Sequence, residues 1–595
     1  MSTQEGIGPL APATPARASL PWGFVLYVAL AAAAVAFAVL APKSGYVLNI
    51  SMQATTYAIA VFGLTVVLGL CGQINLAQAA FFGLGAYAVG LGQVDYGLNF
   101  WVCLLIGMGL AVLMGALLGA STLRLGGHYL AMVTISFQQI VTLVLINWIP
   151  VTKGPDGITR IPRPAPLLDG NMYLGMCVAV LAAIGYLVWR LPHTRLGRAM
   201  RAVRDNELAA GVAGVDVYRV KVTAFAISAL LGGIGGGLFA GGFAYVSPDQ
   251  FSFAESIVFL TMVLLGGVSS PIGAVIGTGL LILIPEWLRF LKSIPGLYLA
   301  IYGAAVILIV LFMPDGIWGF IQGRLDRFRG RRTASPAPHL QLSGGGVGAS
   351  TVLELKGLSK HFGGLKAVDE VDLLIRRGGV HALIGPNGSG KTTTLNVLSG
   401  LYKATSGRVT LNGRDITALP PHARAVAGLG RTFQNIRLWR SMTALENVMI
   451  GAERPGSPVA DQPDALNERA RAALAFVGLE ARADELVSGF SYGHQRAIEI
   501  ARALASDPAL LLLDEPGAGL NSSEKVELRD LLKRISARGL TIFIIDHDMT
   551  LVSEVAEHIT VLNFGRRIAD GQAADVLRHP DVIAAYLGTT PDAPA

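Results

Sequence analysis

The chain has 595 residues, of which 52% are hydrophobic and only 15% charged, and its formal net charge is +7. Soluble proteins average about 25% charged residues, so this composition excludes a chain made only of ordinary soluble domains. It also excludes a typical nucleic-acid-binding protein, because no soluble segment carries a basic stripe. Up to residue 320 or so, apolar runs of about 20 residues recur, the length that crosses a hydrocarbon core of roughly 30 Å.

The first half of the sequence predicts an all-α polytopic membrane domain over residues 21–322, preceded by a disordered Ala/Pro/Ser-rich stretch at 1–20. About ten spans are expected, within a range of eight to eleven, because the Gly-broken segments 63–90 and 254–290 could be re-entrant or split. The first span is interpreted as a retained helix rather than a secretory signal, since its apolar stretch is long. The expected spans are 22–41, 46–70, 77–97, 101–121, 128–149, 172–190, 222–245, 254–269, 271–290 and 297–313.

The positions of the arginines predict which side of the membrane each end of this domain faces. Arginines are concentrated in segments 190–221 and 324–332, and both segments should be cytoplasmic. An even number of spans separates the two segments, in agreement with this orientation. The loop that carries Lys153, Arg160 and Arg163 would then lie on the outer side despite its charge. We expect the even number of spans to decide the orientation despite the positive charge of this loop.

Polar residues interrupt one apolar segment. Gln73, Asn75 and Gln78 must be satisfied by neighbours or line a watery path, because lipid offers no hydrogen bonds. Interhelical hydrogen bonding and a substrate pathway both remain open for them. The small residues of Ala229–Gly242 favour close helix packing. The three cysteines all lie in apolar segments without paired spacing, so neither disulfides nor a zinc site is expected.

A basic, Gly/Ser/Pro-rich segment, 323–351, is predicted to be a flexible linker to a second domain at 352–588, followed by a tail at 589–595. This second domain opens with an apolar strand that leads into a complete phosphate-binding loop of the pattern G-x-x-x-x-G-K-[ST]. The glycines let backbone N–H groups approach phosphate oxygens. The residues expected to bind the nucleotide here are Gly385, Pro386, Asn387, Gly388, Ser389, Gly390, Lys391, Thr392 and Thr393.

Within this loop, Lys391 should reach the β and γ phosphates of ATP, and the Thr392 hydroxyl is placed for Mg²⁺. Downstream, the apolar run Leu510–Pro516 reads as a buried strand that ends in two carboxylates. Asp514 is expected on the Mg²⁺ side, and Glu515 as the base that polarises the attacking water.

Other polar residues are expected to contact the nucleotide or its Mg²⁺. A second buried strand delivers His547 to the same sheet edge, where it could contact the γ phosphate. Gln434 is a candidate sensor of Mg²⁺ and the γ phosphate. Ser491 and Gly493 stand at a helix start, which is a ready-made anion site.

In this order, the phosphate loop, RTFQN, FSYGH, LLLLDEP and the histidine of IIDHD resemble the ATPase domain of ABC transporters. The resemblance implies an α/β P-loop NTPase fold with a helical subdomain and ATP hydrolysis. It also implies that two such domains sandwich ATP head to tail, with the loop at Lys391 facing a partner's signature. Phe362 would stack on adenine.

Two motifs depart from their usual family form. The signature L-S-G-G-Q reads FSYGH here, with Tyr492 and His494 in place of Gly and Gln. The aspartate usual in the following D-loop is Asn521. Glu515 and His547 are both present, so a hydrolysing site is still expected.

Sequence motifs in the predicted membrane half also resemble those of a known family. GQINLAQAAFFGLGAYA, YLAMVTISFQQIV, TKGPDGI, YVSPDQFSF and MVLLGGVSSPIGAVIG are similar to the LivM permease of branched-chain amino acid ABC importers. GLGRTFQNIRLWRSMTALENVMIG and VIAAYLG resemble the companion LivG ATPase. The chain is therefore identified as a fused LivM-like and LivG-like member of this family. Gln138 and Gln139 stand where the permease usually has Gly-Glu.

The resemblance implies an ATP-driven importer subunit in the bacterial inner membrane, with its ATPase in the cytoplasm. Expected companions are a LivH-like permease, a LivF-like ATPase and a periplasmic binding protein, or alternatively a second copy of this chain. A coupling helix within Arg195–Asp216 should dock near Gln434.

The favoured substrates are branched-chain or other hydrophobic amino acids, with urea, short amides and small carboxylates as alternatives. Because the spans hold almost no charge, a zwitterion would have to rest on neutral polar groups, helix ends and a partner chain. An exporter or flippase, and a signalling ATPase without transport, remain as distant alternatives.

Overall fold

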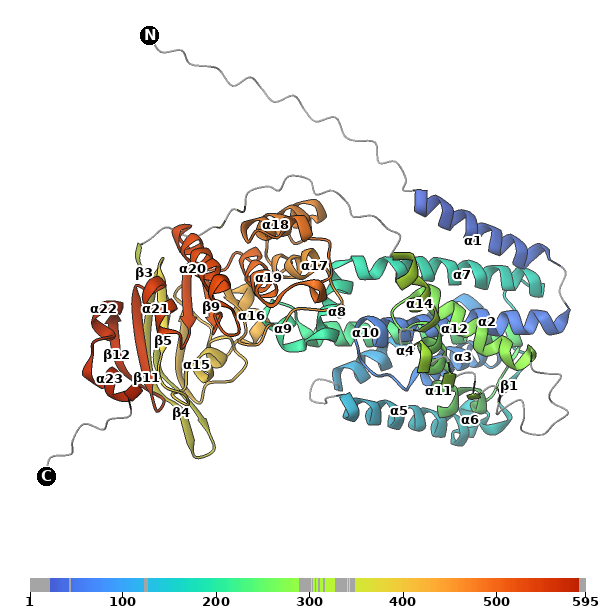
Figure 1. Ribbon diagram of the computed structural model, residues 1–595. Coiled ribbons are helices and arrows are strands. Elements are labelled where there is room, and N and C mark those ends of the chain that lie inside the picture. Colours follow the sequence, from blue (N-terminus) through green and yellow to red (C-terminus); the bar gives the residue numbers. More distant parts are fainter. Residues whose placement is uncertain are drawn as a thin grey trace, which may run out of the picture.

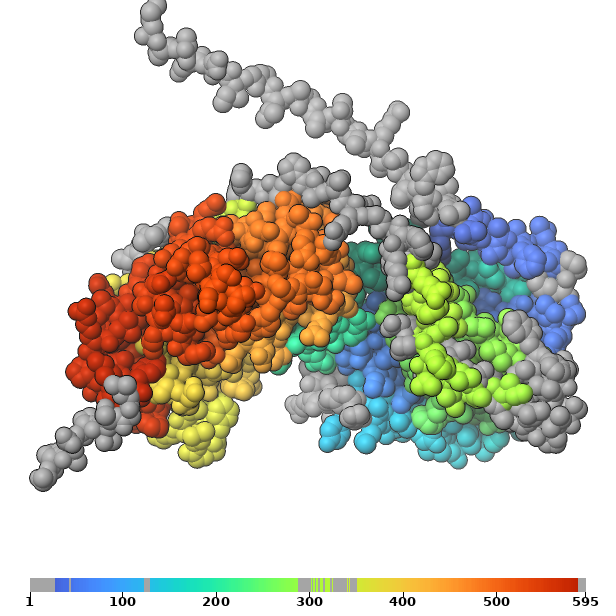
Figure 2. Space-filling model, viewed as in Figure 1, coloured from blue at the N-terminus to red at the C-terminus, as the bar shows by residue number. Residues whose placement is uncertain are grey.

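The computed structural model forms two parts that lie side by side, a mainly helical part up to α14 (Gly316–Asp326) and an α/β part from β3 (Gly348–Phe362) onward (Figures 1 and 2). The predicted disordered stretch 1–20, the tail 589–595 and most of the linker fall outside the described residues. Helix α14 and strand β3 extend into both ends of the predicted linker. The residues described are 22–41, 44–121, 127–287, 316–326 and 348–587, with single positions at 301, 303, 304, 307, 308, 311–313, 340 and 342.

Apolar helices occupy nine of the ten predicted spans, and the tenth, 297–313, lies largely outside the described residues. Helix α2 continues into a π-helix, Thr65–Leu70. The nine helices are α1 (Trp22–Leu40), α2 (Gly45–Leu64), α3 (Gln78–Val94), α4 (Phe100–Ser121), α5 (Gly127–Asn147), α7 (Gly170–Arg190), α10 (Val217–Phe243), α11 (Phe253–Gly266) and α12 (Pro271–Trp287).

The described helices differ in length. In the described part of the chain, five helices are long and apolar enough to cross a membrane, and α11 with α12 could supply a sixth. Those two helices meet at a bend of 120°, where Gly267 adopts a φ of 123°. Segment 254–290 is therefore broken near Gly267, and the bend fits both of the predicted forms, a split span and a re-entrant loop. Helix α1 packs along α7, and the Tyr27 hydroxyl donates to the Ala182 carbonyl oxygen at 2.5 Å.

Helix α10 is the centre of the membrane domain and packs against α2, α3 and α4. Its glycines allow backbone-to-backbone approach, because a Cβ added at Gly236 would lie 1.8 Å from the Phe82 carbonyl oxygen. A Cβ at Gly85 of α3 would lie 2.1 Å from the Gly233 carbonyl oxygen. The packing role predicted for Ala229–Gly242 is confirmed.

A non-helical stretch separates the π-helix from α3, and its polar side chains are buried among neighbouring helices. Gln78 Nε2 donates to the Ala60 carbonyl oxygen at 2.7 Å, and Ser228 Oγ donates to Gln78 Oε1 at 2.9 Å. Asn75 Nδ2 lies 3.2 Å from Gln78 Oε1. For Asn75 and Gln78, these contacts favour interhelical hydrogen bonding, whereas the Gln73 side chain donates to the nearby Cys71 carbonyl oxygen at 3.2 Å, and both roles stay open for it.

The unusual Gln138 belongs to the same network. Its Oε1 accepts from the Ala80 amide at 2.7 Å and from Ser256 Oγ at 3.0 Å. Its Nε2 donates to the Phe251 carbonyl oxygen at 2.7 Å. Gln138 thereby satisfies an N–H group at the start of α3, which would otherwise lack a partner. Gln139 is exposed on the outer face of α5.

The basic loop that conflicted with the orientation lies at the end of the membrane domain away from the α/β part, as parity predicted. Lys153 Nζ pairs with Asp95 at 2.9 Å, and Arg163 Nη2 donates to the Gly242 carbonyl oxygen at 3.1 Å. Beside them, β1 (Ile158–Thr159) pairs with β2 (Tyr245–Val246), and Figure 1 shows β1 at that end.

The α/β part contains two sheets. A six-stranded sheet has the order β12-β11-β5-β10-β9-β8, and its strands are parallel except for β12. A four-stranded antiparallel sheet has the order β4-β3-β6-β7. The strand bounds are β4 (Leu365–Arg377), β5 (Val380–Ile384), β6 (Ser406–Leu411), β7 (Arg414–Asp415), β8 (Leu429–Arg431), β9 (Leu510–Asp514), β10 (Thr541–Ile545), β11 (His558–Asn563) and β12 (Arg566–Gln572).

Helices cover the sheets and form a subdomain beside the membrane domain. In Figure 1 α17, α18 and α19 lie between the six-stranded sheet and the membrane helices. This is the P-loop NTPase fold with a helical subdomain that the sequence predicted. The helix bounds are α15 (Lys391–Leu398), α16 (Pro421–Val426), α17 (Ala444–Ala452), α18 (Pro463–Phe476), α19 (Tyr492–Ala505), α20 (Ser522–Ala537), α21 (Met549–Val555), α22 (Ala573–Val576) and α23 (Pro580–Leu587).

Candidate nucleotide site and its connection to the membrane domain

The loop between β5 and α15 has the backbone of a phosphate cradle. Gly385, Gly388 and Gly390 all have positive φ, at 150°, 81° and 99°. A Cβ at Gly385 would lie 2.1 Å from the Leu562 carbonyl oxygen, and one at Gly390 would lie 2.3 Å from that of Ala367. These two positions therefore require glycine. At Gly388 a Cβ would meet nothing within 4 Å, so this glycine faces open space where a ligand can approach.

Lys391 folds back over this loop. Its Nζ donates to the carbonyl oxygens of Gly385 at 2.8 Å and Pro386 at 2.9 Å. Burial lowers the pKa of Lys391, while nearby Glu515 acts in the opposite direction. Thr392, in the first turn of α15, has an exposed side chain. A cation and a hydroxyl thus lie at the loop where the γ phosphate is expected.

Asp514 offers an oxygen suited to a hard divalent cation. It ends β9 with its side chain 3% exposed, and Oδ2 lies 3.2 Å from Arg431 Nη2. Oδ1 is buried without a hydrogen-bond partner. Burial raises the pKa of Asp514, and Arg431 counteracts it. An unsatisfied buried carboxylate oxygen fits Mg²⁺, which prefers oxygen ligands.

Three of the predicted residues converge beyond the end of β9. Gln434 Nε2 donates to Glu515 Oε2 at 2.8 Å, and His547 Nδ1 lies 3.5 Å from the same oxygen. Glu515 adopts a φ of 43°, a conformation that costs a non-glycine residue free energy and is held by its amide donating to the Ile545 carbonyl oxygen. In this conformation, the Glu515 carboxylate lies beside Gln434 and His547.

The structure also locates Phe362, the residue expected to stack on the adenine of ATP. The Phe362 ring, 43% exposed at the end of β3, meets Tyr402 edge to face at 5.4 Å. It is thus available for stacking. One contact was missed from the sequence: the Gly385 amide donates to the hydroxyl of Tyr586, in the last helix α23, at 2.8 Å. No local pattern links Tyr586 to the phosphate loop.

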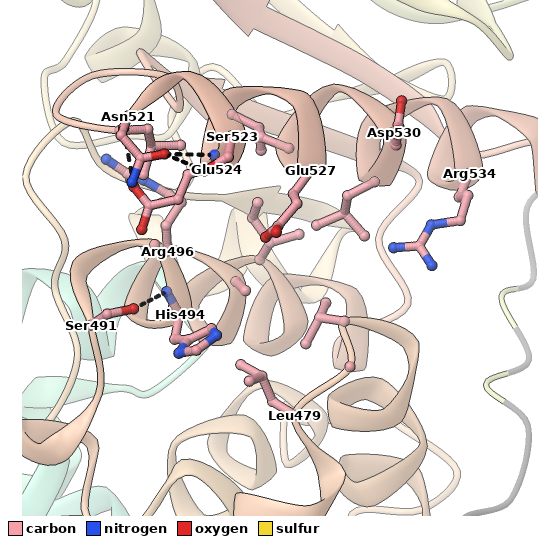
Figure 3. Close-up of a pocket in the computed structure, with 18 residues that line it drawn as sticks. Leu479, Ser491, His494, Arg496, Asn521, Ser523, Glu524, Glu527, Asp530 and Arg534 are labelled. Carbon is pink, nitrogen blue, oxygen red and sulfur yellow. Dashed lines mark hydrogen bonds between the residues drawn. The ribbon is translucent and has the colours of Figure 1, made fainter.

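Ser491 and Gly493 border a pocket of about 760 Å³ between α19 and α20, whose lining residues do not include the phosphate loop (Figure 3). Ser491 caps α19, accepting from the His494 amide at 3.3 Å. Asn521 caps α20 in a reciprocal pair with Glu524, at 2.9 and 3.0 Å. The Asn that replaces the usual aspartate is therefore a helix cap, and the exposed His494 side chain borders the pocket.

Helix α8 (Arg195–Asp205) of the membrane domain docks directly on the α/β part. Arg198 Nε lies 2.9 Å from Glu453 Oε1, and Arg201 Nη2 lies 2.5 Å from Glu446 Oε1. Asp205 accepts from both the amide and the hydroxyl of Ser441, at 3.0 and 2.7 Å. The Arg198 and Glu453 side chains are only 12% and 6% exposed, so this is a desolvated contact.

The docking surface is continuous with the loop of Gln434. Arg437, three residues further on, donates to Asn206 Oδ1 at 3.4 Å. Arg496 of α19 donates to the carbonyl oxygens of Phe433 at 2.5 Å and Gln434 at 2.6 Å. The signature helix, the loop of Gln434 and the membrane helix α8 are therefore joined by direct contacts.

Comparisons with known proteins agree with both halves. A family model described as the permease component of a branched-chain amino acid transport system matches residues 46–311. A model described as ABC transporter matches residues 368–518. A third model, described as branched-chain amino acid ATP-binding cassette transporter, matches residues 566–591 and thus includes Tyr586.

Two sets of relatives match the two halves separately. The branched-chain amino acid transport ATP-binding protein BraF of Pseudomonas aeruginosa is 41% identical over 249 residues, 40% of this chain and 98% of BraF. LivG of Escherichia coli is 40% identical over 250 residues, 98% of its length. The permease protein LivM of Escherichia coli is 34% identical over 296 residues, 45% of this chain and 69% of LivM.

Proposed function

We propose that this chain, which belongs to the branched-chain amino acid ABC transporter family, couples ATP hydrolysis to the import of branched-chain or other hydrophobic amino acids. The observation that carries the proposal is the direct docking of α8 beside the loop of Gln434, whose side chain bonds Glu515. A change at the nucleotide would therefore reach the membrane helices through one contiguous set of contacts.

The hydrolytic roles follow from the positions of the side chains. Lys391 and the backbone N–H groups of residues 387–393 would hold the β and γ phosphates of ATP. Thr392, Asp514 and Gln434 would hold Mg²⁺, which supplies charge neutralisation of those phosphates. Glu515 would accept the proton of the attacking water, since its strained backbone presents the carboxylate beside Gln434 and His547.

A complete site requires a second ATPase. Ser491 and Gly493 lie on a different surface from Lys391, and Ser491 is exposed at the start of a 14-residue helix. A partner's phosphate loop would bring its nucleotide to this helix start, where the N–H groups and the helix dipole favour an anion. We propose a LivF-like ATPase and a LivH-like permease as companions in a bacterial inner membrane, with a second copy of this chain as the alternative.

Substrate delivery is assigned to a periplasmic binding protein. That protein would dock at the end of the membrane domain that carries β1 and β2, away from the ATPase. Urea, short amides and small carboxylates are the competing cargoes, and an exporter would work without any binding protein.

The test is solute uptake into liposomes that contain the full assembly, ATP inside and the binding protein outside. We expect ATP-dependent accumulation of leucine, isoleucine or valine that requires the binding protein. Lys391→Ala should abolish uptake, and Glu515→Gln should slow ATP turnover by a factor of at least about 100. Full-rate uptake by the Lys391→Ala assembly, or efflux without binding protein, would refute the proposed function.

A further inference from the structure

Two carboxylates stand inside the apolar helices of the membrane domain. Among the described residues of α1 to α5, α7 and α10 to α12, the acidic side chains are Glu255 of α11 and Glu286 of α12. An ionisable residue at membrane depth is expensive and normally marks an ion or substrate path. The sequence-based statement that the spans hold almost no charge therefore overlooked a functional candidate.

Glu255 lies near the middle of the membrane domain. The Tyr57 ring of α2 lies 4.9 Å from the ring of Phe259, which is one turn along α11 from Glu255, so Glu255 and Tyr57 lie on helix faces that meet. Tyr57 is the thirteenth residue of the 26-residue span Gly45–Leu70. The next residue after Glu255, Ser256, accepts from the Ala79 amide at the start of α3 at 3.0 Å. The carboxylate is thus about as far from one end of α2 as from the other.

A polar stripe leads from Glu255 toward the outer end of α2. Tyr46, Asn49, Gln53 and Tyr57 share one face of this helix, because they are spaced three, four and four residues apart. Tyr46 hydrogen-bonds to the Glu286 carboxylate at the outer end. Exposure falls along the stripe, from 47% at Tyr46 to 5% at Tyr57. A polar surface that is open outside and closes at mid-depth is the form expected of an outward-facing half-pathway.

Contacts at the Gly69 end of the span Gly45–Leu70 identify which side of the membrane each end of the span faces. Arg204 of α8 donates to the Gly69 carbonyl oxygen at 2.6 Å, and α8 is the helix that touches the ATPase. Gly69 is therefore on the cytoplasmic side and Tyr46 on the outer side. Stripe residues would meet a substrate released by a binding protein before it reaches Glu255.

A purely structural role does not account for a carboxylic acid here. The Tyr57 hydroxyl could be satisfied by an amide or a hydroxyl, which would carry no desolvation cost of a charge. A carboxyl group at mid-depth is suited to a ligand that brings a positive group with it. Among the cargoes considered, amino acids carry an ammonium group, whereas urea, amides and carboxylates do not.

Resting on the proposed function, we infer that Glu255, with Gln53 and Tyr57, is the site that receives the ammonium group of the amino acid midway through the membrane. Tyr46, Asn49 and Glu286 form the outer part of the same path. The ligand class is a zwitterionic α-amino acid, and Glu255 distinguishes it from neutral amides by charge.

The first experiment compares Glu255→Gln with Glu255→Asp in the full assembly in liposomes. Gln keeps a hydrogen-bond partner for Tyr57 but removes the charge, so uptake should fall at least about tenfold. Asp keeps the charge and should retain more uptake than Gln. Asp249→Asn, an exposed acid on the outer 3-10 helix Pro248–Phe251, is the matched control and should transport normally. If Glu255→Gln takes up amino acid at the wild-type rate, the inference is wrong, whereas absence of uptake by the wild type refutes the proposed function instead.

The second experiment leaves Glu255 intact and does not depend on how its variants fold. The native cysteines, Cys71, Cys103 and Cys177, are all buried, so a new thiol can be labelled alone. Asn49→Cys and Gln53→Cys should react with an impermeant trimethylammonium thiosulfonate faster than with its sulfonate analogue, and amino acid should protect Gln53→Cys. Ile59→Cys, fully buried on the same helix, should not react. A Gln53→Cys thiol that is unreactive, or indifferent to reagent charge, contradicts the inference.

Discussion

Arg204 Nη1 donates to the Gly69 carbonyl oxygen at 2.6 Å and lies 3.1 Å from Ser269 Oγ. These contacts tie α8 to two breaks in the membrane helices, the end of the π-helix after α2 and the bend between α11 and α12. The packing there is tight, since a Cβ at Gly72 would lie 2.5 Å from Arg204 Cγ. Helix α8 therefore holds the ATPase through Arg198 and Arg201 and the membrane breaks through Arg204.

Removing this link should uncouple the two domains. Arg204→Ala should lower uptake at least about fivefold while ATP hydrolysis persists, because coupling free energies between sites of this kind typically correspond to factors of 5 to 150. The measurement is the ratio of amino acid imported to ATP hydrolysed in liposomes. Arg219→Ala, whose side chain is 84% exposed on α10, is the control. An unchanged ratio in Arg204→Ala would show that the link carries no coupling.

The buried pair of Arg198 and Glu453 should behave as a unit. Burial raises the pKa of Glu453, and Arg198 opposes that shift, so the carboxylate depends on its partner for its charge. Arg198→Glu should place two carboxylates together and weaken docking by about 3 kcal/mol or more. The double exchange Arg198→Glu with Glu453→Arg should recover part of the uptake. A double-mutant cycle with no interaction between the two positions would contradict this prediction.

Tyr586 should support the phosphate loop. Tyr586→Phe removes the acceptor of the Gly385 amide, a loss of about 1 kcal/mol for one hydrogen bond. We expect KM for ATP to rise about threefold to tenfold with little change in kcat, measured on the full assembly. Tyr218→Phe, on a partly exposed side chain of α10, serves as the matched control. If KM is the same in Tyr586→Phe and wild type, the last helix does not shape the nucleotide site.

The sequence predicted what depends on local spacing and not what depends on distant contacts. The phosphate loop could be predicted because its glycines and Lys391 fall within the short segment 385–391, and the strand before it is continuous and apolar. The two buried strands also placed Glu515 and His547 at one sheet edge, and Gln434 was expected at the same nucleotide. Gln434 Nε2 and His547 Nδ1 lie 2.8 and 3.5 Å from Glu515 Oε2.

No local sequence pattern predicts contacts between residues that are far apart in the chain. Tyr586 meets Gly385 across 201 residues, and Arg204 meets Gly69 across 135. The bend of 120° between α11 and α12 had only the glycines of segment 254–290 as a signal, because its angle depends on packing around Gly267. Glu255 was overlooked since one acid in an apolar run gives no periodic pattern; only its contact with Tyr57 reveals its depth.

A pH-dependent stability is expected from His381, in the strand that leads into the phosphate loop. Burial, with His558 beside it, lowers the pKa of His381 to about 3, and Asp570 only partly opposes this. An unfolded histidine has a pKa near 6.5, so between these values the unfolded state binds more protons. The stabilisation from the neutral ring is complete above about pH 6.5 and is lost as the pH falls, at up to about 1.4 kcal/mol per unit.

His381→Asn should flatten this dependence, because asparagine does not titrate and can still bond Thr560, whose hydroxyl lies 2.9 Å from the histidine Nε2. The measurement is the apparent unfolding midpoint of the ATPase domain within the detergent-solubilised full chain, between pH 7.5 and 5. The variant is expected to be less stable than wild type at pH 7.5, and the difference should shrink toward pH 5. His558→Asn, on the partly exposed neighbour, is the control and should keep most of the slope. Parallel curves for His381→Asn and wild type would mean that the buried ring is not the titrating group.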